Sequence, residues 1–228
     1  CLIPLRHLTY ACLAVTDVNV SQWKHYTRWH VLKSFAKFLP SAFVEADFEF
    51  FGKTLTGQEQ MEARWKKMLG FIDSQIGELL GKVYCEHHFP ETSKRAMIEL
   101  VDRVIASLKD MIKQDLPWMS QETKTAALVK LGTLRVKIGY PDKYKDYSEL
   151  TPKANDSVIS VVRQILLMEH HRDWRQANKP TNRDKWSMPP QMVNAYYSPL
   201  RNEIAFPAAI LQGAAFDPER DLCANYGK

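Results

Sequence analysis

The sequence contains no apolar run of the roughly 18 residues that a membrane-spanning helix requires. It has only four cysteines in 228 residues and no CxxC spacing, which argues against a disulfide scaffold. Its 31 lysines and arginines form no cluster, although a nucleic-acid-binding protein would gather them on one face. We therefore expect no membrane span and no nucleic-acid partner. Buried or incidental free thiols are the simplest interpretation of Cys1, Cys12, Cys85 and Cys223, and they identify no cellular compartment.

The signature motifs of common catalytic centres are also missing. The chain contains no HExxH, no inverted HxxEH, no GxSxG, no GxGxxG and no P-loop. The pairs His87-His88 and His170-His171 each follow a glutamate, but helix neighbours point about 100° apart and cannot easily share one metal. We interpret both pairs as surface or capping residues. The residues therefore predict no catalytic residue, no metal ligand and no cofactor bound within this chain.

Composition and hydrophobic periodicity predict a folded, mainly helical protein. Hydrophobic residues make up 45% of the chain and charged residues 25%, as in ordinary globular domains. Apolar residues recur at helical spacing in six segments: Ser21–Leu39, Ser41–Phe51, Gln58–Tyr84, Thr92–Gln114, a helix capped by Ser120 that runs through Leu131, and Ser157–Trp174. Gly70 and Gly77 inside the third segment each weaken it by about 1 kcal/mol relative to alanine, and close packing is one reason for their presence.

The last fifty residues have a different character. The polar segment 178–190 contains three prolines and predicts a boundary. After it, Met192–Tyr197 and Glu203–Phe206 are predicted to be strands, and Ser198–Asn202 fits a five-residue hairpin loop. The predicted fold class is therefore mainly α, with a helical bundle-like domain followed by a short C-terminal β-hairpin.

The first strand of this hairpin carries an asparagine, a residue that strands disfavour. An exposed strand edge binds an extended peptide through backbone groups, and a side-chain amide supplies both a donor and an acceptor for the same purpose. Asn194 therefore has two interpretations: it contacts a bound peptide, or it is a strand-end or bulge residue.

Several segments together resemble the neprilysin-like zinc metallopeptidases, which include neprilysin, endothelin-converting enzyme and bacterial oligopeptidases. They are FVEADFEFFGKTLTG, RWKKMLGFIDSQIGELLGKVY, DLPWMSQETKTAALVKL, KIGYPDKYKDYS, KWSMPPQMVNAYY and VNAYYSPLRNEIAFPAAILQ, in the family's order. The resemblance covers nearly the whole chain. It implies that residues 1–178 form a helical domain that roofs a peptide cavity, and that residues 179–228 begin a thermolysin-like catalytic domain.

The resemblance also implies roles for three residues of the hairpin region. In the family, the asparagine and alanine of this strand hydrogen-bond the substrate backbone; here they are Asn194 and Ala195. The family's isoleucine that helps to line the pocket for the residue after the scissile bond corresponds to Ile210. A phenylalanine of that pocket is replaced here by Ala215, which implies a wider or less apolar pocket.

The family continues from NYGG into the zinc-binding helix with HExxH, whereas this chain reads Asn225-Tyr226-Gly227-Lys228 and ends. The resemblance thus implies a portion of a zinc metalloendopeptidase that hydrolyses small peptides, with zinc held by the full-length protein. The expected partners are an oligopeptide substrate and the missing catalytic segment or another chain. By itself this chain should be inactive. The alternative is a truncated, non-catalytic peptide- or protein-binding module.

Overall fold

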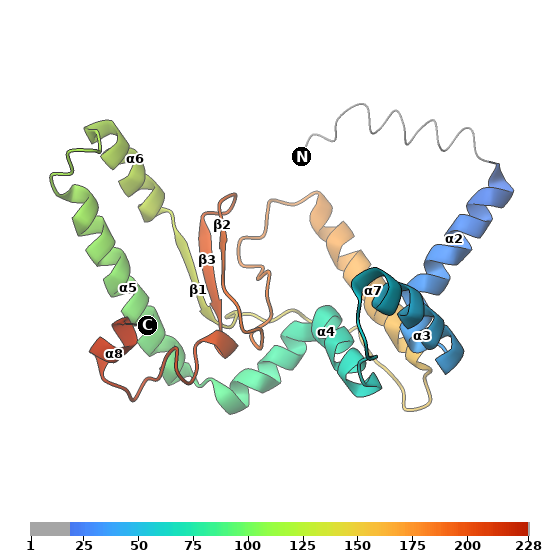
Figure 1. Cartoon of the computed structure of the whole chain (residues 1–228). Helices are drawn as coiled ribbons and strands as arrows, with labels where there is room; N and C mark the ends of the chain where they lie inside the picture. Colours follow the sequence, from blue (N-terminus) through green and yellow to red (C-terminus); the bar gives the residue numbers. More distant parts are fainter. Residues whose placement is uncertain (1–18, 228) are drawn as a thin grey trace. The chain divides into compact units, whose positions relative to one another are not determined.

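The computed structural model describes residues 19–227. The chain folds into two compact units. One unit contains the described part of Cys1–Lys67 together with Lys153–Arg163, and the other contains Met68–Pro152 and Gln164–Lys228. Helices dominate, as predicted (Figure 1).

The described part of the first unit starts with two helices. Helix α2 (Val20–Phe35) starts at Asn19, whose side chain accepts a hydrogen bond from the backbone N–H of Gln22. A short 3-10 turn, η1 (Ala36–Phe38), follows, and Pro40 precedes α3 (Ser41–Asp47). The predicted helix end at Phe51 is wrong, because the chain continues as a π-helix, η2 (Phe48–Thr54).

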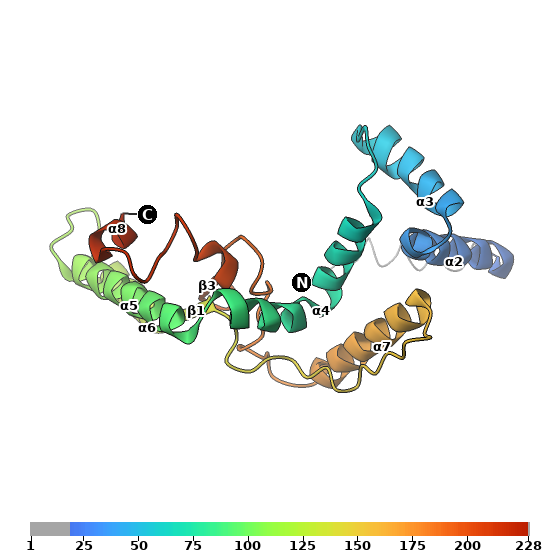
Figure 2. The ribbon, with the colours of Figure 1, turned by 90° about the horizontal axis from the view of Figure 1, so that it is seen from below.

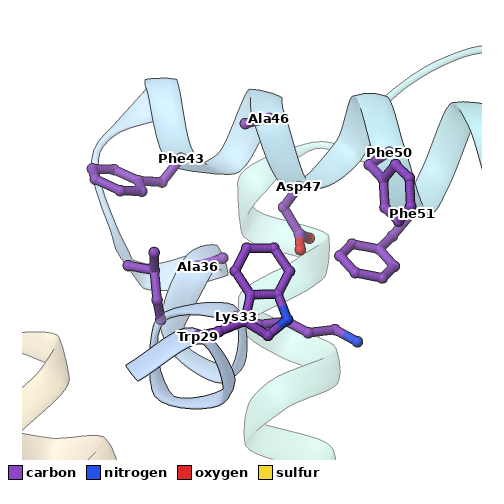
Figure 3. A pocket seen from close by; sticks show the side chains of 9 residues that line it. Trp29, Lys33, Ala36, Phe43, Ala46, Asp47, Phe50 and Phe51 are labelled. Carbon is purple, nitrogen blue, oxygen red and sulfur yellow. The ribbon is translucent and has the colours of Figure 1, made fainter. Parts of the chain in front are cut away.

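These elements enclose an aromatic cavity of about 140 Å³. Figure 3 shows Trp29 and Lys33 of α2 facing Phe50 and Phe51 of η2 across it. The Lys33 ammonium lies 4.1 Å from the centroid of the Phe51 ring, a cation–π distance. All the residues that line the cavity belong to this unit.

Three helices follow in the order that the periodicity predicts. Helix α4 (Arg64–His88) begins later than expected and has non-helical backbone angles at Ile76. Helix α5 (Glu91–Lys113) matches its predicted range closely. Helix α6 (Gln121–Gly132) starts after Ser120, whose side chain accepts from Thr123 N–H as predicted. Helices α5 and α6 lie side by side (Figure 2).

A three-stranded sheet, in the order β1-β3-β2, completes the second unit. The central strand β3 (Glu203–Pro207) pairs in parallel with β1 (Arg135–Gly139) and antiparallel with β2 (Tyr196–Ser198). The hairpin was predicted, but β1 was not. Helix α7 (Val158–Ala177) separates β1 from the hairpin, 3-10 helix η3 (Ala208–Ile210) follows β3, and α8 (Leu222–Tyr226) lies near the end.

One face of the sheet packs on the hydrophobic core of this unit. The core joins α4 and α5 to β1 and to the segment after β3, through Cys85, Phe89, Leu100, Ile138, Ala208, Leu211 and Phe216. Phe89 is 1% exposed, and its ring fills the space beside Gly139, where a Cβ would lie 2.6 Å from the ring. Gly139 has a φ of +74°, so both its backbone and its surroundings require glycine.

Candidate functional site

The hairpin presents its outer strand, β2, at the edge of the sheet. Among residues 19–227, β3 is the strand that pairs with β2, so the opposite edge of β2 carries no partner strand. Such an edge offers backbone donors and acceptors in a row. The arrangement suits the addition of an extended peptide as a further strand.

Asn194 and Ala195 precede β2 directly, rather than lying inside it as predicted. The backbone N–H of Asn194 donates to Met192 C=O at 3.0 Å, and Ala195 N–H donates to the Asn194 side-chain oxygen at 2.8 Å. These bonds replace ladder bonds to β3. The antiparallel register would bring Asn194 opposite Pro207, which has no N–H to donate. The backbone of Asn194 is therefore that of a strand-end residue, the second of the two interpretations.

This position leaves Asn194 accessible. Its side chain is exposed, and within the described residues its amide nitrogen donates to no protein acceptor. Ala195 is half-buried and leads directly into the unpaired edge of β2. An exposed amide donor next to a free strand edge is compatible with contact to a peptide backbone.

Ile210 lies at the end of η3, just beyond β3. It is partly buried and packs against the hydrophobic core. Because β2 and β3 are antiparallel, the start of β2 lies at the same end of the hairpin as the end of β3. Asn194, Ala195 and Ile210 therefore share one end of the hairpin. Ala215 is exposed, and the next residue, Phe216, enters the core.

The segment that leads to Asn194 is held against helix α4. Gly77 and Gly81 of α4 face Pro189 and Pro190, and a Cβ on Gly81 would lie only 2.4 Å from the Pro190 Cδ atom. The side chain of Gln191 donates to Gly77 C=O at 2.9 Å. These contacts fix the chain three residues before the candidate site.

The other face of the sheet contains a buried ionic cluster that sequence reasoning missed. The Glu203 side chain has no exposed surface, and its carboxylate lies 3.0 Å from the Lys137 ammonium. Tyr196 donates its hydroxyl hydrogen bond to the same carboxylate at 3.0 Å, and Arg201 Nη1 lies 3.4 Å away. Burial raises the pKa of Tyr196, and the bond to Glu203 raises it further. Recognising the cluster requires knowledge of the pairing of β1 with β3, because Lys137 and Glu203 are 66 residues apart in the sequence.

Two models of Peptidase family M13 match the chain, one over residues 8–141 and the other over residues 194–228. The chain belongs to peptidase family M13. It is 28% identical over 230 residues to neprilysin-11 of Caenorhabditis elegans, covering 98% of this chain and 27% of that protein. It is 32% identical over 227 residues to endothelin-converting enzyme 1 of Mus musculus, covering 97% of this chain and 29% of that protein.

Solved structures agree with this assignment. The open state of the zinc metalloprotease Zmp1 of Mycobacterium tuberculosis matches with a TM-score of 0.84 and 42% identity, covering 92% of this chain and 32% of that one. PepO of Lactobacillus rhamnosis matches with a TM-score of 0.77 and 26% identity, covering 90% and 33%. The resemblance to neprilysin-like zinc metallopeptidases is thereby confirmed. The chain spans about a third or less of the relatives that it matches.

Zinc is implied for the full-length protein because the chain belongs to peptidase family M13 and its solved relative Zmp1 is a zinc metalloprotease. The residues present here do not fit that metal: across the described ranges, no three His, Cys, Asp or Glu side chains are grouped to hold an ion. No step through zinc can therefore be assigned to these residues. Among the helices between residues 19 and 227, none has the length and apolar character to cross a membrane.

Proposed function

We propose that this chain is the peptide-holding portion of a zinc metalloendopeptidase that hydrolyses small peptides. Asn194 and Ala195 hydrogen-bond the substrate backbone, and Ile210 lines the pocket for the residue after the scissile bond. The single observation that carries the proposal is the unpaired edge of β2, with an exposed asparagine two residues before the strand, in a member of peptidase family M13. In the same proposal, residues 1–178 roof the peptide cavity and residues 179–228 begin the catalytic domain.

In this proposal, Asn194, Ala195 and Ile210 bind the peptide substrate and orient it. An extended peptide beside β2 receives backbone hydrogen bonds from the strand and a donor from the Asn194 amide. Holding the substrate in one orientation lowers the entropic part of the reaction barrier. The zinc chemistry is supplied by residues outside this chain, since the sequence contains no HExxH.

The experiment uses the polypeptide that the complete open reading frame encodes, assayed with a fluorogenic oligopeptide. Asn194→Ala removes one or two hydrogen bonds to the substrate, each worth about 0.5–1.5 kcal/mol. We expect kcat/KM to fall roughly 3- to 100-fold while the fold, followed by circular dichroism, is retained. Val193→Ala is the matched control, because Val193 is the adjacent residue and is 74% exposed.

Two results would contradict the proposal. Equal kinetics of Asn194→Ala and Val193→Ala would remove Asn194 from the binding site. Chelator-sensitive peptide cleavage by the purified 228-residue chain with added zinc would show that the chain carries a catalytic centre of its own.

A non-catalytic binding module is the second candidate, and one observation favours it. Helix α5 and the end of α8 expose a group of apolar side chains: Val104, Leu108, Met111 and Tyr226 are each more than 40% exposed. Exposed apolar groups of this kind mark surfaces that another chain segment or partner covers. Ile204, Phe206 and Ile210 are also only partly buried. A reading frame that continues into HExxH would favour the peptidase, and its absence would favour the module.

A further inference from the structure

Glu203 is a carboxylate with no exposed surface at the first position of the central strand. An ionised group removed from water in this way is strongly destabilising unless charges and hydrogen bonds compensate it. Here both oxygens are engaged. Oε2 accepts from the Lys137 ammonium at 3.0 Å, and Oε1 accepts from the Tyr196 hydroxyl at 3.0 Å.

The groups around Glu203 are themselves tied to the segment that precedes the hairpin. Lys137 also donates to Lys185 C=O at 2.9 Å. Arg201, in the hairpin turn, donates to the same carbonyl at 3.2 Å and to the Ser187 hydroxyl at 2.6 Å. The cluster therefore connects β1, β2, β3, the turn and residues 185–187 through one buried carboxylate.

Tyr196 links this cluster to the candidate peptide-binding edge. It is the first residue of β2 and follows Ala195 directly. Its hydroxyl donates to Glu203 and accepts from Ser187 N–H at 3.3 Å, and its backbone pairs with Ala205 of β3. The side-chain end and the backbone of this half-buried residue are therefore both held. The neighbouring Tyr197 lies on the opposite face of the strand and donates to Asn202 at 3.2 Å, outside the cluster.

We propose that Glu203 is a positioning residue for peptide binding, acting through the hydroxyl of Tyr196. It fixes the start of β2, and with it the backbone of Asn194 and Ala195, before the peptide arrives. An ordered edge binds an extended peptide more tightly because less conformational freedom is lost on binding. This inference rests on the proposed function, because it requires that the peptide binds along this edge.

The test measures how strongly binding depends on the peptide's backbone N–H groups. A non-cleaved peptide inhibitor is compared with a series in which each backbone N–H in turn is N-methylated, using the polypeptide of the complete reading frame. If the peptide pairs with the edge, methylation of a pairing N–H should weaken inhibition roughly three- to tenfold, the value of one hydrogen bond. The ratio of the two inhibition constants is the methylation penalty.

Tyr196→Phe removes one hydroxyl and keeps the ring. We expect the penalty at the pairing position to fall to about twofold or less, because the edge is no longer held in place. Tyr197→Phe removes a hydroxyl from the next residue and should keep the wild-type penalty. Glu203→Gln keeps the shape of the side chain, and where it folds it should behave as Tyr196→Phe does.

The possible outcomes separate the two proposals. If the unsubstituted protein shows no penalty at any position, the peptide does not pair with this edge, and both proposals fail. If the unsubstituted protein shows the penalty and Tyr196→Phe retains it in full, the proposed function stands and the positioning role of Glu203 is overturned. A lower melting temperature with an unchanged penalty also overturns it, since that is the effect of a purely structural residue.

Discussion

The contact between α4 and the Pro189-Pro190 segment gives a sharp prediction about stability. A Cβ at Gly81 would lie 2.4 and 2.8 Å from two atoms of the Pro190 ring and 2.6 Å from the Gln191 side-chain oxygen. A proline ring cannot rotate away as a flexible side chain can, so the helix and the segment must separate. In the same helix, a Cβ at Gly70 would meet no atom within 4 Å. The two glycines are therefore a matched pair.

The two alanine substitutions should change the free energy of unfolding in opposite directions. Overpacking costs about 1–3 kcal/mol, and the severity of the Gly81 contacts favours the upper end. At both sites, alanine in place of glycine stabilises the helix by about 1 kcal/mol through its higher helix propensity. Gly81→Ala should therefore lower the free energy of unfolding by about 2 kcal/mol, and Gly70→Ala should raise it by about 1 kcal/mol.

Urea unfolding followed by tryptophan fluorescence measures both changes. The melting temperature should fall by roughly 4–8 °C in Gly81→Ala and rise by roughly 2–4 °C in Gly70→Ala, as expected for a chain of this size. Equal stability of the two variants would refute the reasoning, because it would show that Pro190 does not pack tightly against α4. Peptide binding should also weaken in Gly81→Ala alone, since Pro190 and Gln191 lead directly to Asn194.

Two further predictions concern buried groups of the second unit. Lys137→Met removes the nearer of the two cations beside the buried Glu203 carboxylate, leaving Arg201 at 3.4 Å, and should lower the free energy of unfolding by up to about 3–5 kcal/mol. Arg135→Met breaks an exposed ion pair in the same strand and should change the free energy of unfolding by less than about 1 kcal/mol. Urea midpoints that shift equally would contradict the burial argument. Burial raises the pKa of the Cys85 thiol to about 11, with a hydrogen bond from Tyr144 opposing the shift. The thiol binds its proton more tightly in the folded state, so this group's contribution to stability is present below about pH 9 and is lost as the pH rises towards 11. Alkylation followed by peptide mass spectrometry at about pH 8 should modify the exposed Cys223 much faster than Cys85, and equal rates would show that Cys85 is accessible.

The helices could be predicted from the sequence because their signals are local. Thr92–Gln114 was predicted from apolar spacing, and α5 occupies Glu91–Lys113. The Ser120 cap was predicted from residue type and is present. The interpretation of the α4 glycines was right for Gly77, where a Cβ would lie 3.2 Å from Pro189, but wrong for Gly70, where a Cβ would meet open space. Which glycine packs against a neighbour depends on tertiary contacts that no local pattern contains.

The strands show where local patterns fail. β1 reads Arg-Val-Lys-Ile-Gly, and its alternating charges resemble an exposed segment rather than one strand of a covered sheet. On its charged side Arg135 stays exposed, whereas Lys137 is nearly buried beside Glu203 and residues 185–187, which receive bonds from Lys137 and Arg201. The predicted strand Met192–Tyr197 shortened to Tyr196–Ser198 because Asn194 bonds to its own neighbour. Asn194 was identified as unusual, but its local turn could not be predicted.

The pairing of β1 with β3 has a consequence for the predicted domain boundary. β1 lies within residues 1–178, and the hairpin lies within residues 179–228, yet they form one sheet. A two-stranded hairpin by itself is at best marginally stable in water, whereas a third strand and a packed face stabilise it. Here β1 supplies both the third strand and Lys137, the nearer of the two cations beside the buried Glu203. The edge proposed to hold the peptide therefore depends on residues from both sides of the boundary, and a domain that began at residue 179 would lack the strand and the charge that keep this edge in place.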